Sequence, residues 1–465
     1  MAIITSISGI RGTIGGRVGE SLSPVDVVKY SAAYGTWINR YASSDSQKPK
    51  VIIGRDARIS GEMVAQFVVG TLQSLGIDVV DLGMATTPTV EMAVMFEQAN
   101  GGIILSASHN PKHWNALKLL NGKGEFISAA DGNIILKLAK DDDFTFSEVT
   151  DLGSYRKDDS YLQKHIDAIL ALDLVDVEAI KKRDFKIVVD GINSVGSFAV
   201  PAMLEALGVQ EIVVINGEAN GHFAHNPEPL PQNLATVSNA VKREEADLAF
   251  VVDPDVDRLA IVCENGDMFG EEYTLVAVAD YILQHKQGNT VSNLSSTRAL
   301  GDITKKRCKK HKYYSSAVGE VNVVAKMKAV DAVIGGEGNG GIIVPELHYG
   351  RDALVGIALF LSHLARFGRS CTLLRSRYPD YTIVKNKIEL TPEIDVDAIL
   401  QQLKQKYKRY PMSTIDGVRI EFDGDWVHLR RSNTEPIIRI YAESSTEAMA
   451  NAMVKRIQEN IKEFI

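Results

Sequence analysis

The chain has 465 residues, of which 45% are hydrophobic and 24% charged, and its formal net charge is −8. This length predicts about three domains, or four small ones, with enough apolar material for several cores. The mildly negative charge, without long blocks of one sign, argues against nucleic acid or a membrane as a partner. No apolar run approaches the ~18 residues that would span a bilayer. The N-terminal segment lacks the features of a secretory signal and the three cysteines show no paired spacing, so we expect a cytoplasmic protein without a disulfide framework or cysteine zinc site.

The first half of the chain alternates short β-branched runs with helical periodicity, which is typical of βαβ units. Strands are expected over 51–53, 77–82, 186–189, 211–215, 248–252 and 259–263, and helices over 61–75 and 200–207. These two helices end alike, in Thr71-Leu-Gln-Ser-Leu-Gly76 and Met203-Leu-Glu-Ala-Leu-Gly208. The similarity suggests a duplicated α/β unit.

The second half continues this pattern and then changes it. Strands are expected over 332–334, 383–390, 417–421, 425–429 and 437–442, and helices over 271–284, 353–367 and 446–464. Ser444 and Glu447 are predicted to form a capping box at the start of the last helix. Composition shifts divide the chain into domains 1–150, 151–265, 266–376 and 377–465. We therefore expect an α/β protein with three similar α/β domains, each with a mixed sheet, and a smaller C-terminal α+β domain.

Three carboxylates follow one another at alternate positions in Asp253-Pro254-Asp255-Val256-Asp257-Arg258. That spacing does not share a helix face, whereas alternate residues of an extended backbone project to one side. Converging carboxylate oxygens suit Mg²⁺. An EF-hand is rejected, because Arg258 stands at its glycine position and a strand is expected directly afterwards. A solvated acidic turn is the alternative.

A serine follows the apolar run over 102–105, in Ser106-Ala107-Ser108-His109-Asn110-Pro111. A serine at the end of a strand can be an exposed nucleophile or a phosphate carrier. The G-x-S-x-G elbow of α/β hydrolases is absent, which weakens an acyl-transfer interpretation. A simple Asx or ST turn remains the alternative.

Two further loops carry polar groups. The glycine-rich segment 335–341 matches neither the Rossmann nor the Walker spacing, but offers Glu337 and Asn339 to sugar hydroxyls. Residues 430–436, with Arg439 beyond them, combine guanidinium, hydroxyl, amide and backbone N–H groups as in a phosphate cradle. Each has a plain turn as its alternative. Together the four loops predict a protein that moves a phosphoryl group on a sugar.

The ordered motifs resemble those of the α-D-phosphohexomutase superfamily, which includes phosphoglucosamine mutases and phosphomannomutase/phosphoglucomutases. The resemblance covers the whole chain through segments 8–12, 106–111, 253–258, 336–340 and 430–436. It implies four domains around a central active-site cleft, with one loop from each lining it.

The resemblance also implies roles for individual residues. Ser108 would carry the phosphate and, with Asp253, Asp255 and Asp257, would hold Mg²⁺. The phosphoryl-transfer site would be lined by Arg11, His109, Lys118 and Arg258. Lys118, expected among cations that lower its proton affinity, would be the acid or base. The substrate would be bound by Glu337, Asn339, Arg430, Ser432, Asn433 and Thr434. Glu320 and Asn339 stand where relatives differ, so both bear on which sugar is preferred.

The implied activity interconverts hexose 6-phosphate and hexose 1-phosphate through a phosphoserine and a bisphosphorylated sugar. Glucosamine 6-phosphate is the favoured substrate, with a phosphomannomutase/phosphoglucomutase as the alternative. A metal-dependent sugar phosphatase and a non-catalytic sugar-phosphate sensor are more distant readings. The expected cofactors are Mg²⁺ and a hexose 1,6-bisphosphate activator, and the expected assembly is a monomer or homodimer.

Overall fold

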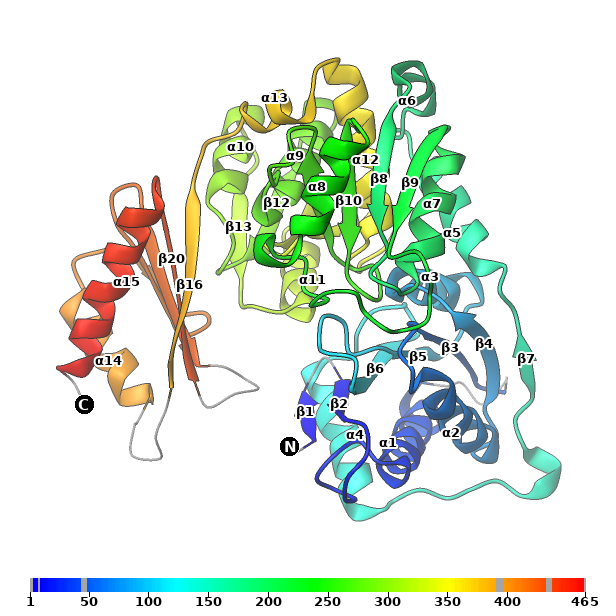
Figure 1. Ribbon diagram of the computed structural model, residues 1–465. Helices are drawn as coiled ribbons and strands as arrows, with labels where there is room; N and C mark the ends of the chain where they lie inside the picture. The colour runs from blue at the N-terminus through cyan, green and yellow to red at the C-terminus, as the bar shows by residue number, and fades with distance from the viewer. Residues whose placement is uncertain (1–2, 7–8, 43–47, 390–395, 432–436, 464–465) are drawn as a thin grey trace.

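The computed structural model describes the chain except residues 1–2, 7–8, 43–47, 390–395, 432–436 and 464–465. The described residues form four sheets, one in each of four successive parts of the chain. In Figure 1 the first part (blue to cyan) lies below the second and third (green to yellow), and the C-terminal part (orange to red) stands to one side. We call these parts domains I to IV.

Domain I contains a mixed sheet. Its strands are β1 (Ile4–Ser6), β2 (Gly9–Thr13), β3 (Lys50–Arg55), β4 (Asp78–Met84), β5 (Gly101–Leu105), β6 (Trp114–Asn121) and β7 (Tyr155–Lys157). Its helices are α1 (Pro24–Trp37), η1 (Ile38–Ala42), α2 (Gly61–Ser74), α3 (Thr87–Phe96), α4 (Ala129–Asp141) and the short η2 (Val149–Asp151). The strand order is β1-β2-β6-β5-β3-β4-β7, parallel from β5 to β7 and antiparallel elsewhere. The last strand of this sheet thus lies beyond the break expected at residue 150.

Domains II and III repeat one smaller plan. Domain II comprises α5 (Tyr161–Leu170), α6 (Val177–Arg183), β8 (Lys186–Asp190), α7 (Gly196–Ala206), β9 (Glu211–Ile215), η3 (Pro231–Asn233), α8 (Ala235–Arg243), β10 (Leu248–Val252) and β11 (Leu259–Cys263). Domain III comprises α9 (Glu271–His285), β12 (Asn289–Asn293), α10 (Ala299–Arg307), β13 (Tyr313–Ser316), α11 (Glu320–Ala329), β14 (Ala332–Glu337), β15 (Gly341–Ile343), α12 (Ala353–Phe367) and α13 (Cys371–Arg375). The orders β11-β10-β8-β9 and β13-β12-β14-β15 each join three parallel strands to one antiparallel edge strand. One apolar core runs through both domains, because α12 packs against α9 as well as α5, α6 and α7.

Domain IV has an antiparallel sheet covered by helices. It comprises β16 (Thr382–Glu389), α14 (Val396–Lys406), β17 (Met412–Ser413), β18 (Val418–Glu421), β19 (Trp426–Arg431), β20 (Ile437–Ser444) and α15 (Glu447–Lys462), in the order β16-β20-β19-β18-β17. The predicted fold class is confirmed. The predicted capping box is wrong: Ser444 is the last residue of β20, and the Thr446 side chain accepts from the Met449 N–H at the start of α15.

The four motif loops share one kind of connection. Each joins two neighbouring antiparallel strands: β5 to β6, β10 to β11, β14 to β15, and β19 to β20. A loop between two paired strands can present side chains while the strands hold its ends rigidly. No helix in the described part of the chain is long and apolar enough to cross a membrane.

Candidate active site

Ser108 lies in the loop after β5 with its backbone in the left-handed region, at φ 48°. A non-glycine residue in this conformation is uncommon and is held there by its surroundings. Its N–H donates to Ser106 Oγ over 2.9 Å, and its hydroxyl donates to Asp253 Oδ2 over 2.7 Å, across 145 positions of sequence. The expected meeting of Ser108 with the acidic loop is therefore present.

Arg58, which was not predicted from the sequence, binds the backbone of the loop that carries Ser108. Arg58 is 1% exposed, and its Nε pairs with Asp56 Oδ2 at 3.0 Å. Its two terminal nitrogens donate to four carbonyl oxygens of the loop, those of Ser108, Asn110, Pro111 and Trp114, over 2.5 to 3.0 Å. A guanidinium supplies this many donors in one plane, which a lysine does not. Arg58 thus fixes the backbone that presents Ser108.

The acidic loop brings its three carboxylates together. Asp253, Asp255 and Asp257 are all 0% exposed, and one oxygen of each lies within 4.8 Å of the others. The loop closes tightly because Asp253 Oδ1 accepts the N–H groups of Asp257 and Arg258, at 3.1 and 3.2 Å. Domain I supports it through Thr87, whose N–H and hydroxyl donate to the carbonyl and Oδ2 of Asp255.

Burial beside two other carboxylates disfavours the charged form of Asp253. Burial raises the pKa of Asp253 well above its usual range, and repulsion from Asp257 and Asp255 adds to this. Asp255 Oδ1 and Asp257 Oδ1 are buried without a hydrogen-bond partner among the described residues. Oxygens left unpaired in this way, in a set of carboxylates, fit a hard divalent cation such as Mg²⁺.

Lys118 extends from β6 to this cluster. Its Nζ lies 2.6 Å from Asp255 Oδ2 and 3.6 Å from Asp257 Oδ2. Burial opposes its charge, but the two carboxylates outweigh burial and raise the pKa of Lys118. The expectation of a lowered proton affinity is wrong, because its nearest neighbours are anions rather than cations.

Positive groups instead surround His109. The pKa of His109 is lowered well below its usual value, first by the charge of Arg258, then by burial and by Arg11. Its Nδ1 lies 3.4 Å from Ser108 Oγ. Burial and the charge of Arg258 likewise lower the pKa of Arg11. Arg11 and Arg258 therefore form a cationic pair beside His109, and their charges favour the neutral form of its imidazole.

Arg351 connects the acidic loop to the glycine-rich loop, although no sequence motif indicated it. It is 8% exposed, and its Nη2 lies 2.7 Å from Asp257 Oδ2 while its Nη1 lies 3.0 Å from Glu337 Oε2. Its Nε and backbone N–H donate to the two oxygens of Glu320, over 2.9 and 3.1 Å. One arginine thus orients three carboxylates, and Glu320 reaches the site as its partner.

The glycine-rich loop is tightly built. Glu337 Oε1 accepts from Asn293 Nδ2 and the Gly319 N–H, at 2.7 and 3.1 Å. Asn339 is half-buried, and its Oδ1 accepts the Gly341 N–H over 3.2 Å. At Gly338 an added Cβ would come within 1.9 Å of the Glu272 carboxylate, so the loop tolerates no side chain there. The Asn339 amide nitrogen is left as the donor that this loop can offer a ligand.

The phosphate-loop prediction is partly outside the described residues. Ser432, Asn433 and Thr434 belong to the segment that is not described. Arg430 lies near the end of β19, directly opposite Arg439 of β20. Like charges placed opposite each other on neighbouring strands are unfavourable unless an anion lies between them. This pair supports the prediction of a phosphate-binding loop.

Comparisons with known proteins agree with this architecture. Sequence models of the phosphoglucomutase/phosphomannomutase family match residues 3–146 (alpha/beta/alpha domain I), 163–266 (domain II), 270–381 (domain III) and 384–460 (C-terminal domain). The chain belongs to this family. It is a mutase of the α-D-phosphohexomutase superfamily, and therefore an isomerase.

Individual relatives span the full length. The chain is 35% identical to a phosphoglucomutase/phosphomannomutase of Thermococcus kodakarensis, over 97% of this chain and 99% of that protein. It is 32% identical to a phosphoglucosamine/phosphogalactosamine mutase of Sulfurisphaera tokodaii, over 99% and 100%. A crystal structure of a phosphoglucomutase/phosphomannomutase family protein from Burkholderia thailandensis matches with a TM-score of 0.83 and 25% identity, covering 100% of this chain and 97% of that one.

Proposed function

We propose that the mutase interconverts hexose 6-phosphate and hexose 1-phosphate by way of a phosphate carried on Ser108. The observation that carries the proposal is the Ser108 hydroxyl, 2.7 Å from Asp253 Oδ2 in a buried group of three carboxylates. A phosphoryl group on this oxygen would face both the carboxylates and the cations Arg258 and Arg11. Opposite charges on two sides of a transferring group hold it in line for displacement.

In the transfer, the bond between phosphorus and Ser108 Oγ breaks and a bond to a sugar hydroxyl oxygen forms. The bisphosphorylated sugar then turns end for end, and Ser108 takes back the other phosphate. Asp253, Asp255 and Asp257 would hold Mg²⁺, which supplies charge neutralisation to the transferring group. We assign the movement of the hydroxyl proton to Lys118, whose Nζ lies beside the same cluster.

The remaining loops would bind the sugar. We propose that Glu337 and Asn339 read its hydroxyls and that Arg430, Ser432, Asn433 and Thr434 bind the phosphate that does not react. Glu320 would act on sugar preference through Arg351, with which it pairs. A hexose 1,6-bisphosphate would serve as activator, since it can load Ser108 directly.

For the substrate we favour glucosamine 6-phosphate, converted to glucosamine 1-phosphate. Glu320 and Glu337 are two buried carboxylates on the glycine-rich side of the site, and Arg351 is the cation between them. Excess negative charge there favours a sugar that carries an ammonium group. The Sulfurisphaera relative is named for aminosugar phosphates, whereas the Thermococcus relative supports a phosphomannomutase/phosphoglucomutase as the second candidate.

Intact mass spectrometry tests the carrier. After incubation with glucose 1,6-bisphosphate, the wild-type chain should gain one phosphate, and Ser108→Ala should gain none. Ser106→Ala removes the neighbouring hydroxyl of the same loop and should keep the added mass. A phosphate that persists in Ser108→Ala, or a fully active Ser108→Ala, would refute the assignment.

Rates on glucosamine, mannose and glucose phosphates, measured side by side, test the substrate. A clear preference for glucosamine 6-phosphate is expected, and comparable rates on all three would defeat the single-sugar claim. Release of inorganic phosphate in proportion to turnover would indicate a phosphatase instead. Ligand binding without serine-bound phosphate would indicate a sensor.

A further inference from the structure

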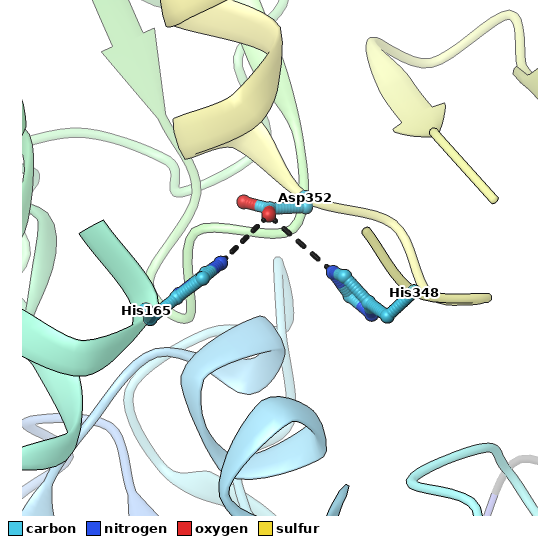
Figure 2. A group of neighbouring side chains, drawn as sticks. All are labelled: His165, His348 and Asp352. Atoms are coloured by element: carbon cyan, nitrogen blue, oxygen red, sulfur yellow. Dashed lines mark hydrogen bonds and ion pairs between the residues drawn. The ribbon is translucent and has the colours of Figure 1, made fainter. Parts of the chain in front are cut away.

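A second cluster of ligating side chains lies away from Ser108, where domains I, II and III meet. His165 comes from α5 of domain II, and Asp352 caps α12 of domain III. His348 comes from the loop between β15 and α12, and Glu91 from α3 of domain I. All four residues are buried, with at most 4% exposed. Figure 2 shows both imidazoles directed at the Asp352 carboxylate from opposite sides.

The three inward-facing atoms have the spacing of metal ligands. His165 Nε2 lies 3.0 Å and His348 Nε2 3.4 Å from the same oxygen, Asp352 Oδ2, and all three atoms lie within 4.8 Å of one another. Zinc binds nitrogen and oxygen ligands at ~2.0–2.2 Å in a tetrahedron, whose ligands are then about 3.3 Å apart. The two shorter separations therefore already match the edges of a zinc tetrahedron.

The ring nitrogens and the carboxylate oxygen that face away from the centre of the cluster also have polar partners, as is usual for residues that bind a metal. His165 Nδ1 lies 3.1 Å from Thr89 Oγ1, and His348 Nδ1 lies 3.3 Å from Glu91 Oε2. Asp352 Oδ1 accepts the N–H groups of Leu354 and Val355 in the first turn of α12. Ligating histidines are commonly oriented by a hydroxyl, carbonyl or carboxylate on the second ring nitrogen. Hydrogen bonds therefore hold His165 and Asp352 from behind, whereas His348 Nδ1 faces Glu91 Oε2 at an ion-pair distance.

We propose that His165, His348 and Asp352 bind a divalent transition metal of the Zn²⁺ class, at a site separate from the carboxylate cluster of the active site. Two imidazole nitrogens and one carboxylate oxygen are a donor set that suits Zn²⁺ rather than Mg²⁺. Three protein ligands leave the fourth position to water or to a further ligand. The proposal does not depend on the proposed hexose phosphate chemistry.

Unsatisfied polar atoms give independent support. Both carboxylate oxygens of Glu91 are buried without a well-formed hydrogen bond to any described residue, and so is His348 Nδ1. Gly350 packs so closely that an added Cβ would lie 1.9 Å from Glu91 Oε2. A buried carboxylate this confined needs positive charge nearby, and a metal on the far side of the His348 ring would strengthen the N–H that faces it.

A cavity of about 530 Å³ at the junction of domains I and III adjoins the cluster, and His348 is the one proposed ligand that lines it, together with Gln98, Lys123 and Glu125. A bound metal would join His165 of domain II to His348 and Asp352 of domain III, one residue away from Arg351, which contacts the carboxylates of the active site.

Metal uptake by the full chain tests the proposal. The protein is stripped with a chelator and titrated with Zn²⁺ by calorimetry in excess Mg²⁺, which occupies the carboxylate cluster. One Zn²⁺ per chain is expected to bind. His165→Gln and His348→Gln should each weaken binding at least 100-fold, and Glu91→Gln should weaken it 10- to 100-fold. His363→Gln is the matched control, because His363 is a buried histidine 3.7 Å from Asp280 and should leave Zn²⁺ uptake unchanged.

Substitution with Co²⁺ identifies the ligands independently of any variant. Wild-type protein should show visible bands of a tetrahedral nitrogen and oxygen site without sulfur charge transfer. Sulfur charge transfer would place the metal at Cys263 and Cys371, a neighbouring pair beside Glu264, and would overturn the proposal. No Zn²⁺ uptake, or uptake unchanged in both histidine variants, would also overturn it. If a histidine variant fails to fold, the Glu91→Gln titration and the Co²⁺ spectrum decide.

Discussion

Replacing Arg351 tests whether one buried arginine sets the geometry of the active site. Its guanidinium contacts the carboxylates of Asp257, Glu337 and Glu320 at 2.7, 3.0 and 2.9 Å, and it is 8% exposed. Arg351→Met keeps much of the packing volume but leaves all three carboxylates without this partner. Removing one member of a buried ion pair costs about 3–5 kcal/mol of unfolding free energy. We expect a loss of that size, limited by protonation of one freed carboxylate.

The effect on activity follows from position rather than from charge alone. Asp257 belongs to the carboxylate cluster and Glu337 to the glycine-rich loop, so both are expected to move when their common partner is lost. A displacement of about 1 Å in a catalytic arrangement costs roughly 100-fold in rate. Arg351→Lys keeps the positive charge but cannot make three directed bonds at once. Lysine should therefore recover most of the stability and little of the activity.

Urea unfolding measures the stability, and kcat/KM on glucosamine 6-phosphate measures the activity. Arg351→Met combined with Glu320→Gln removes one uncompensated charge, and should regain about 0.5–3 kcal/mol relative to Arg351→Met alone. An Arg351→Lys variant with wild-type kcat/KM would show that charge alone matters. Wild-type stability and activity in Arg351→Met would refute the reasoning entirely.

Three further outcomes are expected. Arg58→Lys should lose about 1–3 kcal/mol of stability and slow phosphorylation of Ser108, because a lysine keeps the charge beside Asp56 but cannot donate to all four loop carbonyls; mass spectrometry against time checks the rate. Lys118→Met should lower kcat by about 10²–10⁴-fold with KM little changed, as steady-state kinetics would show. Burial lowers the pKa values of His428 and His363 to about 4, so the unfolded chain takes up protons first as pH falls below ~6.5. The stability that these two histidines contribute should be full above pH 6.5 and decline toward pH 4, and thermal unfolding of His428→Gln should show a shallower decline.

Short-range patterns in the sequence were sufficient for the elements with the clearest apolar runs, whereas helices such as α1 and α11 were not predicted. The strands expected over 248–252 and 259–263 coincide with β10 and β11, because continuous apolar runs end at turn residues on both sides. The helix expected over 353–367 coincides with α12. The start of α15 was misplaced because Ser444 and Thr446 both carry hydroxyls suited to capping, and pairing of β20 with β16 extends the strand through Ser444. Two hydroxyl residues compete as the helix cap here, and the pairing of Ser444 with Thr382 in the sheet leaves Thr446 as the cap.

The candidate site likewise contains residues that the sequence predicted and residues that it did not. Residues of the motif loops were found because several polar groups stand within a few positions of one another, as in 253–258. Arg58 and Arg351 were missed because most of their partners are distant in the sequence. The loop carbonyls that Arg58 binds lie 50 to 56 positions away, and the carboxylates that Arg351 binds lie 14 to 94 positions away. The predicted direction of the Lys118 pKa shift was wrong for the same reason, because Asp255, which raises this pKa, is 137 positions distant in the sequence. Electrostatic environment depends on which segments the fold brings together.

The hairpin placement of the motif loops explains why such distant residues can still form one site. The loops after β5, β10 and β14 each join two paired antiparallel strands, so the strands fix the ends of each loop relative to its own sheet. The relative position of the sheets must then come from residues between the loops. Thr87 ties domain I to Asp255, Arg351 ties the acidic loop to Glu337, and the cluster around Asp352 ties three domains together. If Glu320 acts on sugar preference as proposed, specificity can change through its pairing with Arg351 without any change in the loops themselves.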